Sequence, residues 1–252
     1  MLSQTRTLNI GAPQGCVLSA LLFSLYTNDF ISHSQLVSFF KYADDTTVVG
    51  YFKSGDESAY RAEVAAALDW CSANNLVLNL AKAKEMVIDF RKNTTGLPPL
   101  IIRDQPVDWV DSFKFLGTTI CRSMKWEVNT NMILSKAHQR LHFLRLLRRF
   151  GVTGEAMVHF YRAAVESVLT FSVTVWEGNT TAMEKKQLDR VVHIASKITG
   201  RNLPTVSSIY TARTKRRMQK VMADTSHPAR CLFKFLPSGR RLQSFKCKTS
   251  RP

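Results

Sequence analysis

The sequence predicts a mixed α/β fold with strands in the first half of the chain and helices in the second. Three observations predict it. Apolar stretches at residues 36–40 and 46–51 flank the adjacent pair Asp44-Asp45, a pattern typical of a strand-turn-strand element. Short strand candidates punctuated by Pro and Gly follow, as far as residue 120. After Trp126 the apolar residues recur every three or four positions, which is the spacing of amphipathic helices.

In the first half, residues 17–30 predict a helix and residues 37–50 a hairpin with the two carboxylates at its tip. Residues 56–74 predict a second helix with one buried face. That face is expected to hold Ala62, Ala65, Ala66 and residues 68–70. Short strands are expected at residues 86–90, 100–102 and 113–120, interrupted by Pro98-Pro99, Pro106 and Gly117.

In the second half, Leu134, Ala137, Leu141, Leu144 and Leu147 share one face of a predicted helix. A break at residues 151–154 separates it from a helix over 155–175, and a third helix is expected at 181–199. The four Trp residues are expected to anchor the core. The resulting division is 1–126, 127–200 and a basic segment at 201–252.

Charge favours a polyanionic partner. The chain has 35 Lys and Arg against 19 Asp and Glu, a formal charge of +16, and its last 52 residues hold 13 Lys or Arg and one acid, Asp224. Such side chains contact the phosphates of a nucleic acid and do not distinguish its base sequence. The candidates for nucleic-acid backbone contacts are Arg213, Lys215, Arg216, Arg217, Arg240 and Arg241. The alternative interpretation is a disordered basic tail that keeps the chain in solution.

The five cysteines form no Cys-x-x-Cys pair, so reduced thiols and an intracellular location, cytoplasmic or nuclear, are expected. No apolar run reaches the roughly 18 residues of a membrane span. Residues 1–10 lack the order of a signal peptide. The sequence therefore gives no reason to expect a membrane partner.

The Asp44-Asp45 pair predicts half of a metal site. Two neighbouring carboxylates repel each other unless a cation lies between them, and oxygen ligands suit Mg²⁺. Phosphoryl transfer with two metal ions normally adds a third carboxylate. An isolated Asp-Asp pair is also typical of a solvated turn, because Asp favours local backbone hydrogen bonds.

Neighbouring motifs extend the pattern. Residues 11–19 read Gly-Ala-Pro-Gln-Gly-Cys-Val-Leu-Ser, residues 26–29 Tyr-Thr-Asn-Asp, and residues 42–45 Tyr-Ala-Asp-Asp. Two further motifs follow along the chain, at residues 70–82 and at residues 113–117, which read Phe-Lys-Phe-Leu-Gly. This succession resembles the palm of a reverse transcriptase, most closely that of LINE-type non-LTR retroelements. Residues 137–145, 160–176, 227–230 and 236–241 resemble the region that follows the palm in those proteins, so the likeness covers nearly the whole chain.

The resemblance implies a partial polymerase palm, a helical thumb-like region and RNA-directed DNA polymerisation with Mg²⁺ or Mn²⁺, on an RNA template and a DNA primer. It implies that Asp44 binds metal with Asp45 in support, and that Lys82 lies near the leaving pyrophosphate. Pro13, Gln14, Gly15, Tyr42 and Ala43 would border the nucleotide and template, where small residues allow close backbone approach. Phe115, Leu116 and Gly117 would form the primer grip.

Two parts of the family pattern are missing from the chain. The first metal-binding Asp of the family would precede Gly11, yet residues 1–10 contain no Asp or Glu. The fingers region that would come before it is missing as well. We therefore expect the chain by itself not to be a working polymerase.

Two other functions compete with this one. A non-catalytic nucleic-acid-binding protein would use the helices and the basic segment, with the palm as a scaffold. Residues 134–151 also faintly resemble the N-terminal helical start of an AlkB-homologue tRNA-modification protein. No His has Asp two positions on, as an iron dioxygenase requires, and no Gly-x-Gly supports a methyltransferase loop.

Overall fold

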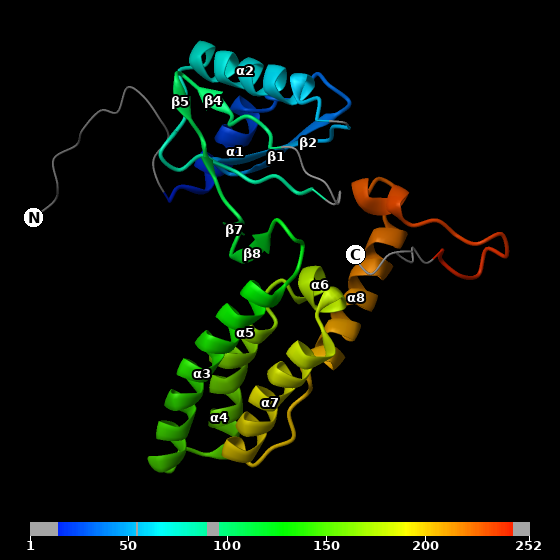
Figure 1. The fold of residues 1–252 in the computed structure, drawn as a ribbon. Coiled ribbons are helices and arrows are strands. Elements are labelled where there is room, and N and C mark those ends of the chain that lie inside the picture. Colours follow the sequence, from blue (N-terminus) through cyan, green and yellow to red (C-terminus); the bar gives the residue numbers. More distant parts are fainter. Residues whose placement is uncertain (1–14, 54, 90–95, 244–252) are drawn as a thin grey trace, which may run out of the picture. The chain divides into compact units, whose positions relative to one another are not determined.

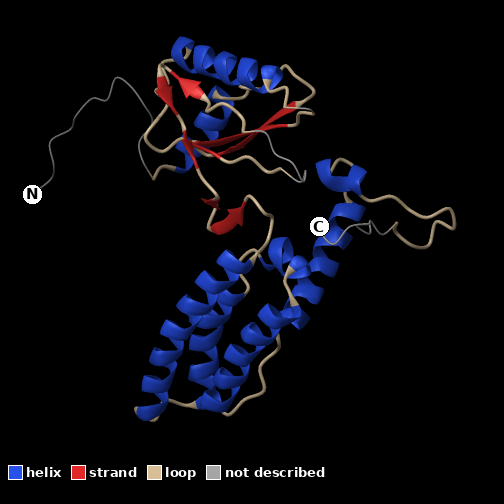
Figure 2. Cartoon of the chain, viewed as in Figure 1, coloured by secondary structure: helices blue, strands red, loops and turns tan. Residues whose placement is uncertain are grey.

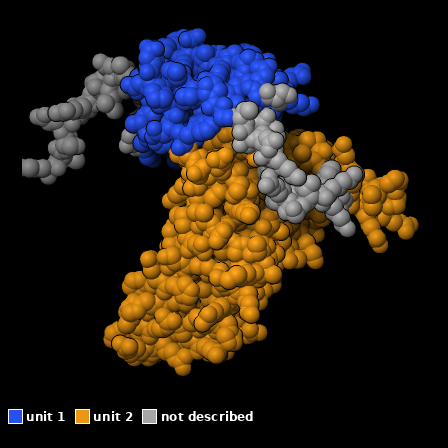
Figure 3. All heavy atoms as spheres, viewed as in Figure 1, with its two compact units in different colours: residues 1–85, 91–109 blue, residues 86–90, 110–252 orange. Residues whose placement is uncertain are grey.

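The computed structural model describes residues 15–53, 55–89 and 96–243. The chain divides into two compact units, whose described residues Figure 3 shows in two colours: the unit of residues 1–85 and 91–109, and the unit of residues 86–90 and 110–252. Strands lie in the first half of the sequence and helices dominate the second (Figure 2). The predicted mixed α/β class is thereby confirmed.

The first unit contains two main helices and several short strands (Figure 1). The helices are α1 (Val17–Tyr26) and α2 (Ser58–Ala73). Strands β1 (Val37–Tyr42) and β2 (Asp45–Gly50) pair antiparallel. The remaining strands have two residues each: β3 (Lys84–Glu85) pairs in parallel with β6 (Asp108–Trp109), and β4 (Ile101–Ile102) pairs antiparallel with β5 (Gln105–Pro106).

A small apolar core holds this unit together. Val64 of α2 packs with Leu100, Ile102 and Val107, and partly buried residues including Val48 of β2 lie against them. Helix α1 contributes no buried residue, and its Val17, Leu21 and Leu25 are 90%, 57% and 64% exposed. The core therefore joins α2 to the strands and leaves the apolar side chains of α1 in water.

The predicted buried face of α2 is wrong at its three alanines, although Leu68 packs against the core as expected. The buried residues of this helix are Glu63 and Val64, whereas Ala62, Ala65 and Ala66 are exposed. Glu63 tolerates burial because its carboxylate accepts hydrogen bonds from the backbone N–H of His33, at 3.1 and 3.2 Å. Apolar periodicity cannot detect a buried face built around a satisfied polar group.

The second unit begins with the hairpin β7 (Ser112–Phe115) and β8 (Thr118–Cys121) and continues as helices. These are α3 (Glu127–Arg149), α4 (Gly154–Phe160), α5 (Ser167–Leu169), α6 (Val173–Trp176), α7 (Ala182–Thr199) and α8 (Val206–Ala223). A π-helical segment, Tyr161–Glu166, joins α4 to α5, and 3₁₀ turns occupy Glu177–Asn179 and Pro228–Leu232. The predicted helix over 155–175 is thus interrupted, and Ser172 has a φ of 48° at the break.

One extended core supports these helices. Leu141 and Leu144 of α3 are fully buried, as are Leu188 and Val191 of α7. Trp126 and Trp176 belong to the same core, which confirms their expected role as anchors. The helix ends also match the sequence: Thr181 and Glu184 form a capping box at the start of α7, and Gly200 ends it in the left-handed conformation.

Helix α8 was not predicted. It occupies part of the segment that charge alone describes as a basic tail, and its buried residues are Val206 and Val221, near its two ends. Thr205 caps its first turn by accepting a hydrogen bond from Ser208 N at 3.2 Å. The many charged residues between the two buried valines hide the helical period.

Candidate functional site

The two adjacent carboxylates lie at the tip of the β1–β2 hairpin. Tyr42 pairs with Asp45 across the strands, so only Ala43 and Asp44 form the loop. Ala43 has a φ of 52°, and a positive φ at the first loop residue suits a two-residue hairpin turn, usually with Gly there. Both Asp side chains are exposed. The turn therefore presents two oxygen-rich groups to solvent from a register fixed by strand pairing.

Lys41, one residue before this turn, ties the hairpin to the end of α1. Its ammonium donates a hydrogen bond to the main-chain oxygen of Thr27, the C-cap residue of α1. The same nitrogen lies 5.9 Å from the centre of the Phe30 ring, a cation–π distance. The Tyr-Thr-Asn-Asp segment and the Tyr-Ala-Asp-Asp turn are thereby held together.

Aromatic side chains extend this connection to α2. Phe30 stacks on Trp70 with ring centroids 4.6 Å apart, and it also contacts Phe39 of β1 at 5.1 Å. Tyr26 approaches the edge of Trp70 at 6.5 Å, and its hydroxyl donates to the main-chain oxygen of Asn74. The hairpin, the end of α1 and the end of α2 share one aromatic cluster. This cluster is a positioning device that sequence reasoning missed.

Lys82 lies in an exposed turn of the same unit, ahead of β3. Its backbone N–H donates to Asn79 O at 3.1 Å. Its neighbours Leu80 and Ala83 pack against the small core to which Val48 of β2 also packs. One core thus supports both the Lys82 turn and the carboxylate hairpin, and the Lys82 ammonium remains exposed.

The other predicted nucleotide-site residues are only partly described. Pro13 and Gln14 lie outside the described residues. Gly15 is exposed, with a φ of 79°, and precedes Cys16 at the N-cap of α1. That backbone conformation favours glycine, as expected for a turn that enters a helix.

The predicted primer-grip residues belong to the second unit. Phe115 ends β7 and pairs with Thr118, so Leu116 and Gly117 form a two-residue loop. Their φ values are 45° and 87°, as a type I′ hairpin turn requires at both positions. A Cβ at Gly117 would lie 2.9 Å from the Phe171 ring, so the loop packs tightly on the chain near α5. Its own unit therefore fixes the conformation of this hairpin.

A buried carboxylate organises the chain beside β3. Glu85 accepts hydrogen bonds from Trp109 Nε1 at 2.7 Å and from Leu100 N at 3.3 Å. Burial, followed by the negative charge of Glu85, raises the pKa of Tyr60 to about 12. Trp109 is 48% exposed, so it is not the core anchor that the sequence predicted, although Glu85 holds its indole N–H.

The basic candidates on α8 divide into two groups. Arg213 donates to Thr170 O at 2.8 Å and Arg217 donates to Thr174 Oγ1 at 3.2 Å, so both connect α8 to the α5–α6 segment. Lys215 and Arg216 are exposed and form no ion pair within the described part of the chain. Arg240 and Arg241 are exposed as well. Lys215 and Arg216 are the α8 candidates not engaged in such contacts.

The donor set at the hairpin tip fits a hard cation. Mg²⁺ is commonly held by one or two carboxylates, with water and substrate phosphates completing its shell, and Asp44 with Asp45 supplies the two carboxylates. Within residues 15–53, 55–89 and 96–243, no three His, Cys, Asp or Glu side chains gather closely enough to hold a metal ion. Asp44 and Asp45 are consecutive and exposed at the turn, and they are the two carboxylates that it offers.

No helix within the described ranges is long and apolar enough to cross a membrane. Cys16, Cys71, Cys121 and Cys231 are free thiols.

Comparison with protein families gives two matches. Residues 2–120 match the family "Reverse transcriptase (RNA-dependent DNA polymerase)". Residues 126–167, which include α3 and α4, match the family "Alkylated DNA repair protein alkB homolog 8, N-terminal". The first match contains the carboxylate hairpin, and the second covers only a short helical stretch.

Three curated Drosophila melanogaster proteins are similar to the chain. The probable RNA-directed DNA polymerase from transposon BS is 23% identical over 68% of this chain and 20% of its own length. The probable RNA-directed DNA polymerase from transposon X-element is 22% identical over 66% of this chain and 19% of its own length. The RNA-directed DNA polymerase from mobile element jockey is 26% identical over 48% of this chain and 14% of its own length. The chain thus spans about a fifth or less of each relative. No solved structure matches it significantly.

Proposed function

Since residues 2–120 are a reverse transcriptase domain, distantly similar to the RNA-directed DNA polymerases of non-LTR retrotransposons, we propose that the chain holds part of a polymerase palm. In this proposal residues 1–126 are the palm, 127–200 a thumb-like region and 201–252 a basic nucleic-acid-binding segment. The two-residue turn that exposes Asp44 and Asp45 together is the observation that carries the proposal.

Asp44 and Asp45 would hold Mg²⁺ or Mn²⁺, because two adjacent carboxylates are hard oxygen ligands. The ion would stabilise the charge that develops on the transferred phosphoryl group. Lys82 would attract the pyrophosphate through its exposed ammonium. Gly15, Tyr42 and Ala43, with Pro13 and Gln14, would border the nucleotide and template. Phe115, Leu116 and Gly117 would meet the primer.

The 252-residue chain is expected to extend a primer poorly by itself. A two-metal phosphoryl transfer site normally uses at least one more carboxylate, and the described residues bring only Asp44 and Asp45 together at this turn. The exposed tip also leaves both side chains in bulk water, where their hold on a cation is weak.

Primer extension on an RNA template with Mg²⁺ or Mn²⁺ tests the catalytic part of the proposal. The parent chain, Asp44→Ala and Asp69→Ala would be compared, since Asp69 is an exposed carboxylate on α2 and does not belong to the hairpin. Extension that Asp44→Ala abolishes and Asp69→Ala retains would overturn the expected inactivity and establish the site. Electron paramagnetic resonance of free Mn²⁺ supplies a readout besides activity. Equal Mn²⁺ uptake by the parent and Asp44→Ala would contradict the metal assignment.

A second candidate function is nucleic-acid binding without catalysis. Exposed Lys215 and Arg216 on α8, in a chain of formal charge +16, favour it. Titration of a fluorescent single-stranded RNA at about 50 and 200 mM salt tests it, since phosphate contacts weaken steeply with salt. Tight binding at both concentrations would contradict phosphate contacts, and no binding would exclude the function. Because the described thiols are free, we infer an intracellular location, cytoplasmic or nuclear.

A further inference from the structure

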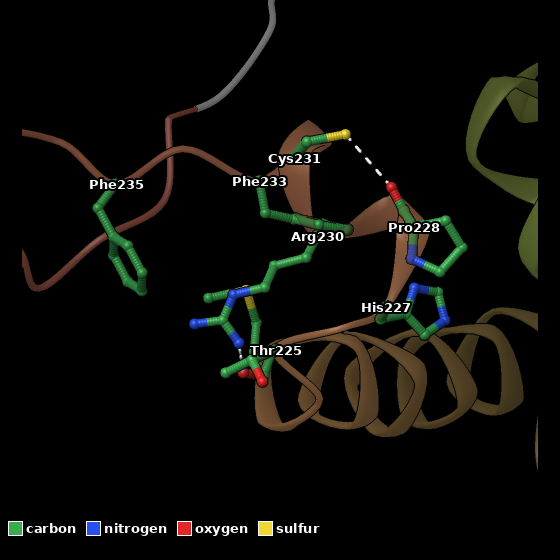
Figure 4. A pocket seen from close by; sticks show the side chains of 8 residues that line it. Thr225, His227, Pro228, Arg230, Cys231, Phe233 and Phe235 are labelled. Atoms are coloured by element: carbon green, nitrogen blue, oxygen red, sulfur yellow. Dashed lines mark hydrogen bonds between the residues drawn. The ribbon is translucent and has the colours of Figure 1, made fainter.

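A cleft opens where the chain leaves α8 (Figure 4). Its volume is about 470 Å³, within the rough range of 300 to 1,000 Å³ typical of ligand pockets. The lining is mainly apolar, with two aromatic rings from a segment after α8, Phe233 and Phe235. The remaining lining residues are Met222, Thr225, His227, Pro228, Arg230 and Cys231. The cleft lies wholly within the second unit.

Local hydrogen bonds shape the floor of this cleft. His227 caps the 3₁₀ turn Pro228–Leu232 by accepting, at Nδ1, a hydrogen bond from Ala229 N at 3.1 Å. The Arg230 guanidinium donates to Met222 O at 2.5 Å and so fastens the turn to the end of α8. The cleft is therefore built by a capped turn with fixed side chains.

A small hairpin holds Phe235 in the same short segment as three basic residues. Phe235 and Leu242 form an antiparallel bridge, Leu236 N donates to Arg241 O at 2.7 Å, and Gln243 N donates to Lys234 O at 2.7 Å. This pairing puts Lys234 next to Phe235 on one strand and Arg241 next to Leu242 on the other, with Arg240 one residue before. All three basic side chains are exposed. Phe235 itself is 53% exposed, so its ring is open to a stacking partner.

The electrostatic surroundings favour an anionic occupant. None of the lining residues is acidic. Asp224, the one acid after residue 200, accepts hydrogen bonds from the backbone N–H and the hydroxyl of Ser226, and these bonds lower its pKa. This carboxylate serves the turn after α8. Exposed rings beside uncompensated cations are the combination that binds single-stranded nucleic acid, because bases stack on rings while phosphates meet cations.

We propose that this cleft binds a base of a single-stranded polynucleotide, stacked on Phe235, with flanking phosphates on Lys234, Arg240 and Arg241. The inference rests on the proposed nucleic-acid binding and deepens it by assigning a base-stacking site. It separates two contributions: the basic surface of α8 would contact phosphates of any strand, while the cleft would require an unpaired base.

Fluorescence anisotropy with the full chain tests the proposal. The probes are an oligodeoxyadenylate of about 12 nucleotides, an abasic deoxyribose-phosphate strand of equal length, the corresponding duplex, and an oligoriboadenylate that shows whether the sugar matters. Phe235→Ala is expected to weaken oligodeoxyadenylate binding by about 5- to 150-fold, the effect of removing one stacking ring. It should leave binding of the abasic strand and the duplex unchanged.

Matched variants distinguish base stacking in the cleft from phosphate contacts. Phe235→Trp should restore binding of the adenylate, because it restores a stacking ring. Phe150→Ala removes a ring that is 79% exposed beyond the end of α3, away from the cleft, and should have no effect. Arg240→Ala should weaken all probes and reduce the salt dependence. Circular dichroism melts of each variant verify folding.

The outcomes are distinguishable. If the parent binds no probe, the proposed nucleic-acid binding fails together with the cleft. If the parent binds with salt dependence but Phe235→Ala binds the adenylate equally well, only the base-stacking site is refuted, and another occupant such as a peptide is indicated. Equal losses for the adenylate and the abasic strand would also overturn the proposal, because they would show that Phe235 acts through folding.

Discussion

The ring of Phe30 lies on the indole of Trp70, with centroids 4.6 Å apart and planes inclined by 25°. This stack connects the segment after α1 with helix α2. The Lys41 ammonium lies over the Phe30 ring. Lys41 lies one residue before the carboxylate turn, and its ammonium also donates a hydrogen bond to Thr27 O. The geometry of the turn therefore depends on an aromatic contact made elsewhere in the unit.

Replacing Phe30 should destabilise the first unit. Phe30 is 8% exposed, so Phe30→Ala removes a buried ring and is expected to cost about 3 to 5 kcal/mol in the free energy of unfolding. Phe40→Ala, on β1, is the control, because Phe40 is 55% exposed and should cost far less. Urea denaturation followed by Trp fluorescence measures both. Similar midpoints for the two variants would contradict the importance of the stack.

The strained loop residue Ala43 gives a second test. A branched side chain tolerates a positive φ poorly, so Ala43→Val should lower the free energy of unfolding by about 1 to 2 kcal/mol. Ala43→Gly relieves the strain but raises the conformational entropy of the unfolded chain. Its free energy of unfolding should therefore lie within about 1 kcal/mol of that of the parent. Chemical denaturation of the three chains gives the order. A Val variant as stable as the Gly variant would show that the turn adopts another conformation.

Tyr60 predicts an alkaline loss of stability. Its folded-state pKa is about 12, above the ordinary value of 10.0, so the unfolded chain releases this proton first as pH rises. The stability that the neutral Tyr60 side chain contributes is complete below pH 10 and is lost between about pH 10 and 12, by about 3 kcal/mol. Tyr60→Phe should reduce the slope of stability against pH in that window. Tyr51→Phe, at a ring 63% exposed, should retain it.

The β7–β8 turn predicts a cost for adding one methyl group. Gly117→Ala forces an alanine into a φ of 87°, and its Cβ would lie 2.9 Å from the Phe171 ring. The substitution should therefore destabilise the second unit by about 1 to 3 kcal/mol. Gly96→Ala is the matched control, since a Cβ there meets nothing within 4 Å. Thermal melts compare them. An unchanged melting temperature for Gly117→Ala would mean that the ring moves away without cost.

The two groups of α8 cations should behave differently in binding. Lys215→Ala and Arg216→Ala should each lower the salt slope of single-strand binding by about 0.7 without altering the melt. Arg213→Ala removes the hydrogen bond to Thr170 O and should cost about 1 kcal/mol in stability. Salt titrations paired with melts test both statements. If all three variants change only binding, Arg213 is a phosphate contact.

The sequence predicted local structure best where one physical signal dominates. The hairpin over 37–50 is confirmed because two apolar stretches enclose a tight turn, and α7 is confirmed because its caps and its apolar period agree. Ordered motifs identified the reverse transcriptase domain. The roles of Asp44, Lys82 and the primer-grip residues remain predictions.

Features that depend on tertiary contacts were missed. Glu63 is buried because His33 donates to it, and α8 exists although only Val206 and Val221 are buried in it. The stack of Phe30 on Trp70 joins residues 40 positions apart, and Glu85 meets Trp109 across a parallel pair of short strands. No local pattern encodes such pairings, because side chains far apart in the chain decide them.

Helix α1 has a practical consequence for the physical behaviour of the protein. Its Val17, Leu21 and Leu25 all meet water, and clustered apolar side chains of this kind promote association between molecules. Concentrated samples of the isolated chain are therefore expected to self-associate, with light scattering that rises faster than protein concentration. Folding and binding constants should be measured at low concentration, where they describe single molecules.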